Sequence, residues 1–294
     1  MSTREAFDSR LGAALLLIPT IVVSIGFLYY PAILAIRTSF FESTFGRDDV
    51  FVGVENYVDL FTDPSYHVSV GITILFGIVV VGGVMAFSLY VTFLIHEVDY
   101  GQSVYLVSAI WPYALPPAVA ALVFTFIIHP SLGVLTGPIQ SAGFSVDWFN
   151  TGGQAFVVVT VTAIWKQIGY NVIFMIASMN NIPNALTETA DLDGIGRVRR
   201  LARIYVPIMT PTLFFLVIIN TIYAFFGTFA FIDLMTDGGP SNATNILIFD
   251  LYQEAFSFFN FGMASTKSVV LFGVVGILMY VQFRLTDKYS HYGA

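Results

Sequence analysis

The sequence predicts an all-α, polytopic membrane protein with six transmembrane helices in a single transmembrane domain, residues 1–294. Hydrophobic residues make up 56% of the chain and charged residues only 11%, whereas a soluble domain carries about 25% charged residues. The apolar residues also form long runs without Asp, Glu, Lys or Arg, and these runs exceed the roughly 20 residues that a helix needs to cross a bilayer. We expect helices because backbone groups in lipid must pair within their own segment.

The six expected spans lie near residues 11–37, 69–95, 103–128, 155–180, 208–232 and 264–284. The first run is longer than the 7–15 apolar residues of a signal peptide, so we interpret it as a retained helix. The third lies in a longer apolar run and contains Trp111-Pro112 and Pro116-Pro117. These prolines remove helix hydrogen bonds and are expected to kink the segment. The freed carbonyl groups would line a cavity or simply mark a packing kink.

The distribution of Lys and Arg predicts the orientation in the membrane. With the amino terminus in the cytoplasm, eight of the twelve basic residues lie on the cytoplasmic side, as the positive-inside rule favours. Six spans then return the carboxyl terminus to the same side. We therefore expect a multi-pass protein of the cell (plasma) membrane with both termini cytoplasmic.

The most densely charged segment lies between the fourth and fifth expected spans, at about residues 183–211. Uncharged runs on both sides indicate an exposed loop. Within it, Pro183-Asn184 can begin a short helix with Asn184 as the N-cap, and Gly194 suits a left-handed C-cap. His96-Glu97, at the end of the second span, is expected to be solvated.

Six positions of this segment match the pattern Glu-Ala-Ala, two positions, Asp-Gly and then a Pro…Pro pair. They are Glu188, Ala190, Asp193, Gly194, Pro207 and Pro211. The segment therefore resembles the coupling loop of permease subunits of binding-protein-dependent ABC importers. Thr189 and Ile195 depart from the family pattern.

Further stretches extend the resemblance over nearly the whole chain. They are Val52–Tyr57, Trp165–Asn171, Asn181–Pro183, Tyr223–Phe226, Thr236–Pro240 with Thr244, and Ser268–Leu271. They are similar to the carbohydrate-uptake class of these importers, and within it most similar to the A-type permease subunits for glycerol-3-phosphate. Sugar permeases share much of the pattern, so a neutral mono- or oligosaccharide is the alternative substrate.

The resemblance implies the type I ABC importer permease fold and a set of partners. These are a second homologous permease subunit, two cytoplasmic ATPase subunits, an extracytoplasmic solute-binding protein and the lipid bilayer, with no nucleic acid. The short helix would dock on an ATPase subunit and transmit its ATP-driven closure. Leu186, Ala190 and Leu192 would make the apolar contact. Glu188 and Asp193 would make charged contacts or brace the loop, next to Gly194.

Lys166 is the strongest candidate for contact with substrate, because a charged side chain inside a span usually faces a cavity or a partner. Gln167, Tyr170 and Asn171 follow, and the i,i+4 pairs 166/170 and 167/171 predict one broad polar face. A lysine with amide donors would suit a phosphate. The alternatives are that Lys166 pairs with a carboxylate of the partner subunit or extends outward to the interface.

The sequence lacks the motifs of several other functional classes. No G-x-x-x-x-G-K-[ST] occurs, so ATP hydrolysis is expected on separate subunits. The chain has no cysteine, and its four histidines are scattered, so we expect no catalytic site, no cofactor and no metal. An ion-coupled secondary transporter would show inverted repeats, and an intramembrane enzyme would show a convergent catalytic set. Neither feature is evident.

Overall fold

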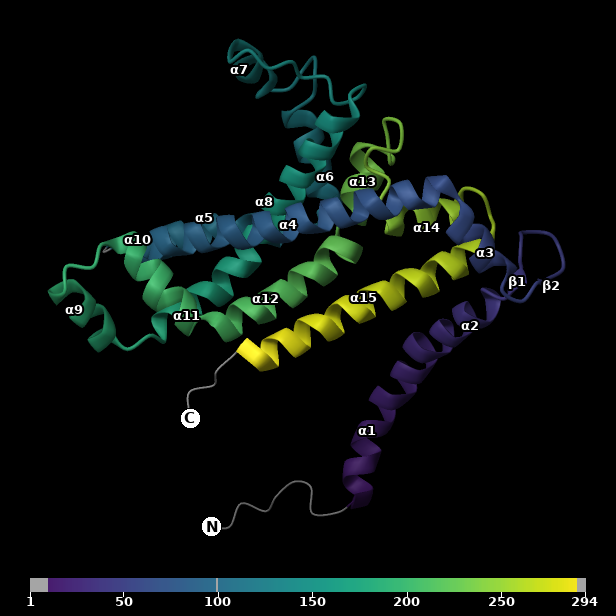
Figure 1. Ribbon diagram of the computed structural model, residues 1–294, viewed down its shortest axis with the longest axis horizontal. Helices are drawn as coiled ribbons and strands as arrows, with labels where there is room; N and C mark the ends of the chain where they lie inside the picture. The colour runs from purple at the N-terminus through teal and green to yellow at the C-terminus, as the bar shows by residue number, and fades with distance from the viewer. Residues whose placement is uncertain (1–9, 99, 290–294) are drawn as a thin grey trace. The chain divides into compact units, whose positions relative to one another are not determined.

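The computed structural model describes residues 10–98 and 100–289 (Figure 1). The backbone contacts group the chain into two compact units, and each is described by itself. The first unit comprises Met1–Asp63 and Leu251–Phe272, and the second comprises Pro64–Asp250 and Gly273–Ala294. The predicted cytoplasmic ends of the chain, residues 1–9 and 290–294, lie outside the described residues.

The described residues contain the predicted membrane spans. Five helical segments are long and apolar enough to cross a bilayer: Leu15–Thr38, Pro64–His96, Gly152–Asn180, Thr210–Met235 and Phe261–Thr286. The third expected span is divided into α5 (Gln102–Ala114) and α6 (Pro117–Ile127), which are bent by 101°. If this bent pair counts as one span, the number is six. The prediction of a polytopic helical protein is therefore confirmed.

The bend between α5 and α6 has a direct cause in the sequence. Pro116 and Pro117 have no backbone N–H, so they cannot donate to Pro112 and Tyr113 one turn earlier. Leu115, the residue before Pro116, has extended backbone angles, φ −70° and ψ 139°, as expected for a residue that precedes proline. The predicted kink is therefore a complete break in the helix.

The first unit contains α1 (Arg10–Ser24), a wider π-helical turn (Ile25–Tyr29), α2 (Tyr30–Thr38) and α3 (Glu55–Thr62). A two-stranded hairpin of β1 (Phe41–Glu42) and β2 (Val50–Phe51) is a small exception to the all-α prediction. Asn56 joins these parts by donating to the carbonyl oxygens of Ser39 and Phe41, both at 3.0 Å. The unit also holds the end of α14 (Leu247–Phe256) and the start of α15 (Phe261–Tyr289).

The second unit is built around α8 (Gly152–Asn180), which packs against α4 (Pro64–His96), α5 and α12 (Thr210–Ile222). At Gly169, a Cβ atom would lie 2.8 Å from the carbonyl oxygen of Ala109. Only glycine permits this close approach of α5 to α8, as is common between membrane helices. A methionine-rich core joins α4, α8 and α12, and its buried members include Phe93, Met175, Met179, Tyr205, Met209 and Leu216.

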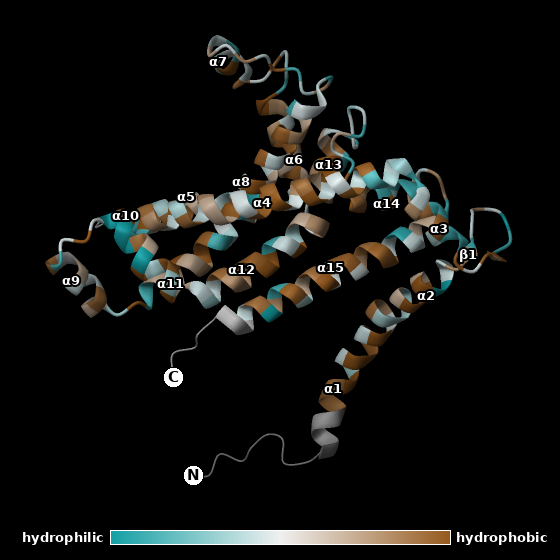
Figure 2. Ribbon diagram, in the orientation of Figure 1, coloured by the Kyte–Doolittle hydropathy of each residue, from teal (hydrophilic) through white to brown (hydrophobic). Residues whose placement is uncertain are grey.

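The remaining elements of the second unit connect these helices. They are α7 (Thr136–Ser141), α9 (Asn184–Leu192), α10 (Arg197–Arg200), a π-helical turn (Leu201–Tyr205), α11 (Val206–Ile208), a second π-helical turn (Tyr223–Gly227) and α13 (Phe229–Met235). Figure 2 shows that the long helices are mostly hydrophobic, whereas α10 is hydrophilic. The charged segment between α8 and α12 therefore differs from the spans on either side of it.

Candidate functional site

The charged segment after α8 forms a short helix with a left-handed end, as the sequence predicts. The helix α9 begins at Asn184 and ends at Leu192, and Gly194 has φ +68°. The Ile195 N–H donates to the Ala190 carbonyl oxygen at 2.9 Å, which closes the end of the helix. This arrangement is typical of a glycine C-cap.

The side chains of α9 divide between the interior of the chain and its surface. Ala190 is only 2% exposed, whereas Leu192 is 89% exposed and Leu186 is also exposed. Glu188 and Asp193 are exposed as well. Of the three residues expected to make an apolar contact, Leu186 and Leu192 are accessible, and Ala190 packs within this chain.

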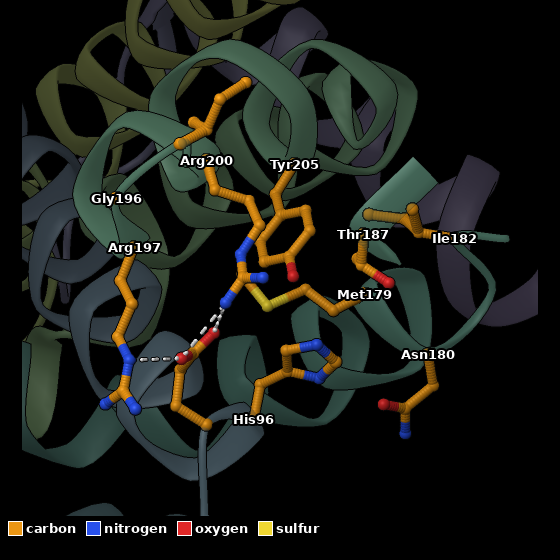
Figure 3. Close-up of a pocket in the computed structure, with 11 residues that line it drawn as sticks. His96, Met179, Asn180, Ile182, Thr187, Gly196, Arg197, Arg200 and Tyr205 are labelled. Atoms are coloured by element: carbon orange, nitrogen blue, oxygen red, sulfur yellow. Dashed lines mark hydrogen bonds and ion pairs between the residues drawn. The ribbon is translucent and has the colours of Figure 1, made fainter. Parts of the chain in front are cut away.

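Glu97 holds α10 by two arginines, which the sequence did not predict. Arg200 donates from Nη2 to Glu97 Oε1 at 3.1 Å, and Arg197 Nε lies 3.2 Å from Glu97 Oε2 (Figure 3). The Glu97 side chain is only 13% exposed, so the expectation that it is solvated is wrong. The sequence did not indicate this role because the two arginines that bind Glu97 come about a hundred residues later in the chain.

A cavity of about 640 Å³ lies between this ion pair and the end of α8. Figure 3 shows His96, Arg200 and Tyr205 around its centre, with Thr187 of α9 on another wall. The His96 ring meets the Tyr205 ring edge to face, with centroids 5.5 Å apart. The charged segment is therefore joined to the inner part of the helix bundle by polar and aromatic contacts together.

Lys166 lies inside the bundle and is bound to the broken helix. Its Nζ donates to the carbonyl oxygen of Tyr113 at 2.8 Å and lies 4.6 Å from the centre of the Tyr113 ring. The residue is 5% exposed. Hydrogen bonding to a main-chain carbonyl, together with a cation–π contact, compensates the charge in this apolar surrounding.

Gln167 and Asn171 do not share the face of Lys166. The amide of Asn171 and that of Asn220, on α12, donate to each other at 3.1 and 2.7 Å, and Gln167 donates to the same Asn220 oxygen at 3.2 Å. All three residues are buried. The one broad polar face expected from the sequence is therefore two faces, one toward α5 and one toward α12.

Tyr170 belongs to a row of aromatic rings that extends from the broken helix to α12. Its ring centroid lies 5.3 Å from that of Tyr113 and 5.0 Å from that of Phe174, which in turn lies 5.5 Å from Phe215. Tyr113, Phe174 and Phe215 are exposed on this isolated chain. The row is a surface where a ligand or another chain can make contact with aromatic faces.

The sequence contained weak signals for the residues that it missed. Asn220 is a single amide in the apolar run of the fifth span, and such residues commonly hydrogen-bond to another helix. The Tyr113 carbonyl is implied by Pro117, four residues later. Within residues 10–98 and 100–289, no three His, Asp or Glu side chains gather in a way that could hold a metal ion.

Sequence comparison relates the chain to inner-membrane components of transport systems. A family model described as "Binding-protein-dependent transport system inner membrane component" matches residues 78–288. The chain is 38% identical over 290 residues to the sn-glycerol-3-phosphate transport system permease protein UgpA of Brucella abortus biovar 1 (strain 9-941), covering 98% of this chain and 99% of that protein. It is 36% identical over 291 residues to the protein of the same name from Rhizobium meliloti (strain 1021), covering 99% of each.

Solved structures agree in fold. A chain of a bacterial ABC transporter involved in the import of the acidic polysaccharide alginate has a TM-score of 0.81 at 20% identity, covering 94% of this chain and 95% of that one. A second structure shows a bacterial alginate ABC transporter in complex with an alginate pentasaccharide-bound periplasmic protein. It also has a TM-score of 0.81, at 19% identity, covering 96% of each chain. This level of identity supports the fold alone.

Proposed function

Because the chain belongs to the family of binding-protein-dependent transport system inner membrane components, we propose that it carries sn-glycerol-3-phosphate across the cell membrane. In this proposal the two compact units act as one permease domain. The chain pairs with a second, homologous permease, two cytoplasmic ATPase subunits and an extracytoplasmic solute-binding protein. Both of its termini lie in the cytoplasm. The substrate assignment is supported by full-length sequence identity of 36–38% to permeases named for sn-glycerol-3-phosphate.

We propose that α9 is the contact with the ATPase. The exposed side chains of Leu186 and Leu192 would enter an apolar groove, and Glu188 and Asp193 would make charged contacts at its edge. Ala190 would hold the helix against its own chain, and Gly194 would set the direction in which the chain leaves it. In an importer whose ATP site lies on a separate subunit, this exposed helix is a suitable point for force to enter the membrane domain.

For Lys166 we propose a bracing role, in which it supports the break between α5 and α6. A second proposal is that the same ammonium attracts the phosphate of the substrate, with Tyr170 at the aromatic row and Gln167 and Asn171 behind it. The first is favoured by the hydrogen bond to Tyr113 and by the burial of Lys166. The second is favoured by the position of a cation close to exposed rings.

A neutral mono- or oligosaccharide is the alternative substrate. The exposed rings of Tyr113, Phe174 and Phe215 favour it, because aromatic faces suit the apolar faces of sugar rings. An ion-coupled transporter has no comparable observation in its favour.

The substrate can be tested with the reconstituted complex. Proteoliposomes that contain both permeases, the ATPase and the cognate binding protein should accumulate labelled glycerol-3-phosphate when ATP is present. Labelled maltose and labelled glycerol serve as neutral controls. Accumulation of a neutral sugar in preference to glycerol-3-phosphate would reject the phosphate assignment while leaving the importer intact.

A further inference from the structure

Glu97 occupies a position that a helix does not favour by itself. It directly follows α4, where its N–H still donates to the Phe93 carbonyl oxygen at 3.1 Å. The carbonyl end of a helix carries partial negative charge, so a carboxylate there is unfavourable unless cations compensate it. Arg197 and Arg200 provide that compensation. The carboxylate therefore depends on α10, an element from a distant part of the sequence.

The two arginines are placed so that one carboxylate can bind both. They are the first and last residues of α10, three positions apart, and residues at that spacing share a helix face. Arg200 is buried and reaches both carboxylate oxygens, at 3.1 and 3.4 Å. The Arg197 side chain is 73% exposed and contributes a single contact. We call Glu97, Arg197 and Arg200 the Glu97 clamp.

The Glu97 clamp adds α4 to the helices that a movement of α9 can reach. From α9 the chain continues through Gly194 and α10 into α11 and α12, so a displacement of α9 reaches α12 along the backbone. The helix α4 comes from an earlier part of the sequence, and the clamp binds its end to α10. Tyr205 strengthens the junction, since its ring lies 5.9 Å from the Arg200 guanidinium and 5.5 Å from the His96 ring.

We infer that Glu97 is a positioning residue for energy coupling: it ties α10 to α4, so that displacement of α9 by the ATPase moves α4 together with α12. This inference rests on the proposed docking of α9 with an ATPase subunit. In this role the carboxylate acts through the two arginines. Loss of its charge would leave α9 and α12 connected along the backbone and α4 packed in the methionine-rich core, but would release the end of α4 from α10.

The test uses the complete complex in proteoliposomes and measures substrate taken up per ATP hydrolysed. Glu97→Gln keeps the size of the side chain and removes its charge. We expect the ratio to fall about fivefold or more, because coupling free energies between sites commonly correspond to factors of 5–150. Glu97→Asp, which keeps the charge, should lie closer to wild type. Arg199→Gln is the matched control, since Arg199 lies in the same short helix and is exposed.

The outcomes separate this inference from the proposed function. A wild-type complex without ATP-dependent uptake would reject the proposed function. A wild-type complex that transports normally, beside a Glu97→Gln complex with the same uptake per ATP, would overturn the inference. An equal loss in Arg199→Gln would also overturn it, by showing a general effect of charge. If Glu97→Gln fails to assemble, Arg200→Gln removes the buried arm of the clamp, which reaches both carboxylate oxygens, and an unchanged ratio in that variant overturns the inference.

Discussion

The ammonium nitrogen of Lys166 lies 2.8 Å from the carbonyl oxygen of Tyr113, the group that the helix break leaves without its usual donor. In a continuous helix this carbonyl would accept from the N–H of residue 117, which here is proline. A side chain from α8 thus supplies the missing hydrogen bond of α5. The Lys166 ammonium, which the sequence predicts as a phosphate ligand, is hydrogen-bonded to the backbone of its own chain.

The first prediction concerns this bond. In Lys166→Gln, loss of a charge-assisted hydrogen bond should destabilise the assembled complex by about 1.5–3 kcal/mol, while glycerol-3-phosphate uptake per assembled complex stays near wild type. Thermal inactivation of the purified complex and uptake normalised to complex by immunoblot give the two quantities. Lys166→Arg keeps the charge and serves as the control for stability.

The competing role of Lys166 predicts the opposite pattern. If the ammonium binds phosphate, Lys166→Gln should assemble normally and lose roughly tenfold or more in anion uptake at limiting substrate, since a charge-assisted contact contributes about 1.5–3 kcal/mol. That result would contradict the bracing role.

The second prediction concerns the amides that join α8 and α12. Asn220→Leu removes the hydrogen bonds that the buried amides of Asn171 and Gln167 make to Asn220, while Asn171 keeps its bond to the Gln167 carbonyl oxygen at 3.0 Å. Hydrogen bonds between membrane helices contribute about 0.6 kcal/mol on average and up to 1–2 kcal/mol. The double variant Asn171→Leu with Asn220→Leu removes both members of the reciprocal pair. Its loss in thermal stability should therefore be smaller than the sum of the two single losses.

A matched control exists in the same helix pair. Thr212 Oγ1 donates to Ser178 Oγ at 3.2 Å, also between α12 and α8. Ser178→Ala combined with Asn220→Leu should be additive, because the two sites share no partner. Additivity within the Asn171 and Asn220 cycle itself would count against a coupled pair.

The spans were predictable because their signal is compositional and local. A long run without charged residues indicates a membrane helix regardless of what it packs against. Pro116-Pro117 indicates a helix break because the missing N–H groups are a property of these residues alone. The size of that break, 101°, depends on what α5 and α6 each pack against. No local pattern contains that information.

The candidate site was less predictable, because helical spacing cannot say which neighbour a residue meets. Lys166 and Gln167 are adjacent in sequence, and a rotation of about 100° between them places one against α5 and the other against α12. Glu97 was missed for a related reason. Its partners, Arg197 and Arg200, belong to a segment that folds back from far along the chain.

The third prediction concerns the end of α9. At Gly194, φ is +68° and a Cβ atom would meet nothing within 4 Å, so a substitution there acts through backbone strain alone. Valine disfavours this conformation by roughly 1–2 kcal/mol, whereas asparagine tolerates it. Gly194→Val should therefore lower uptake per ATP in reconstituted complexes, with Gly194→Asn closer to wild type. Equal ratios in the valine variant and wild type would remove Gly194 from the coupling mechanism.

The last prediction concerns orientation, and the cysteine-free sequence makes it direct to test. Single cysteines at Asp48, Ser145 and Ser241 should react with an impermeant thiol reagent on intact cells, because these exposed residues lie in loops that the positive-inside rule places outside. A cysteine at Thr189, exposed on α9, should react only after the membrane is opened. If the chain is inserted the other way, the cysteine at Thr189 will react on intact cells and the other three will be protected. That result would also place the proposed ATPase contact on the wrong side of the membrane.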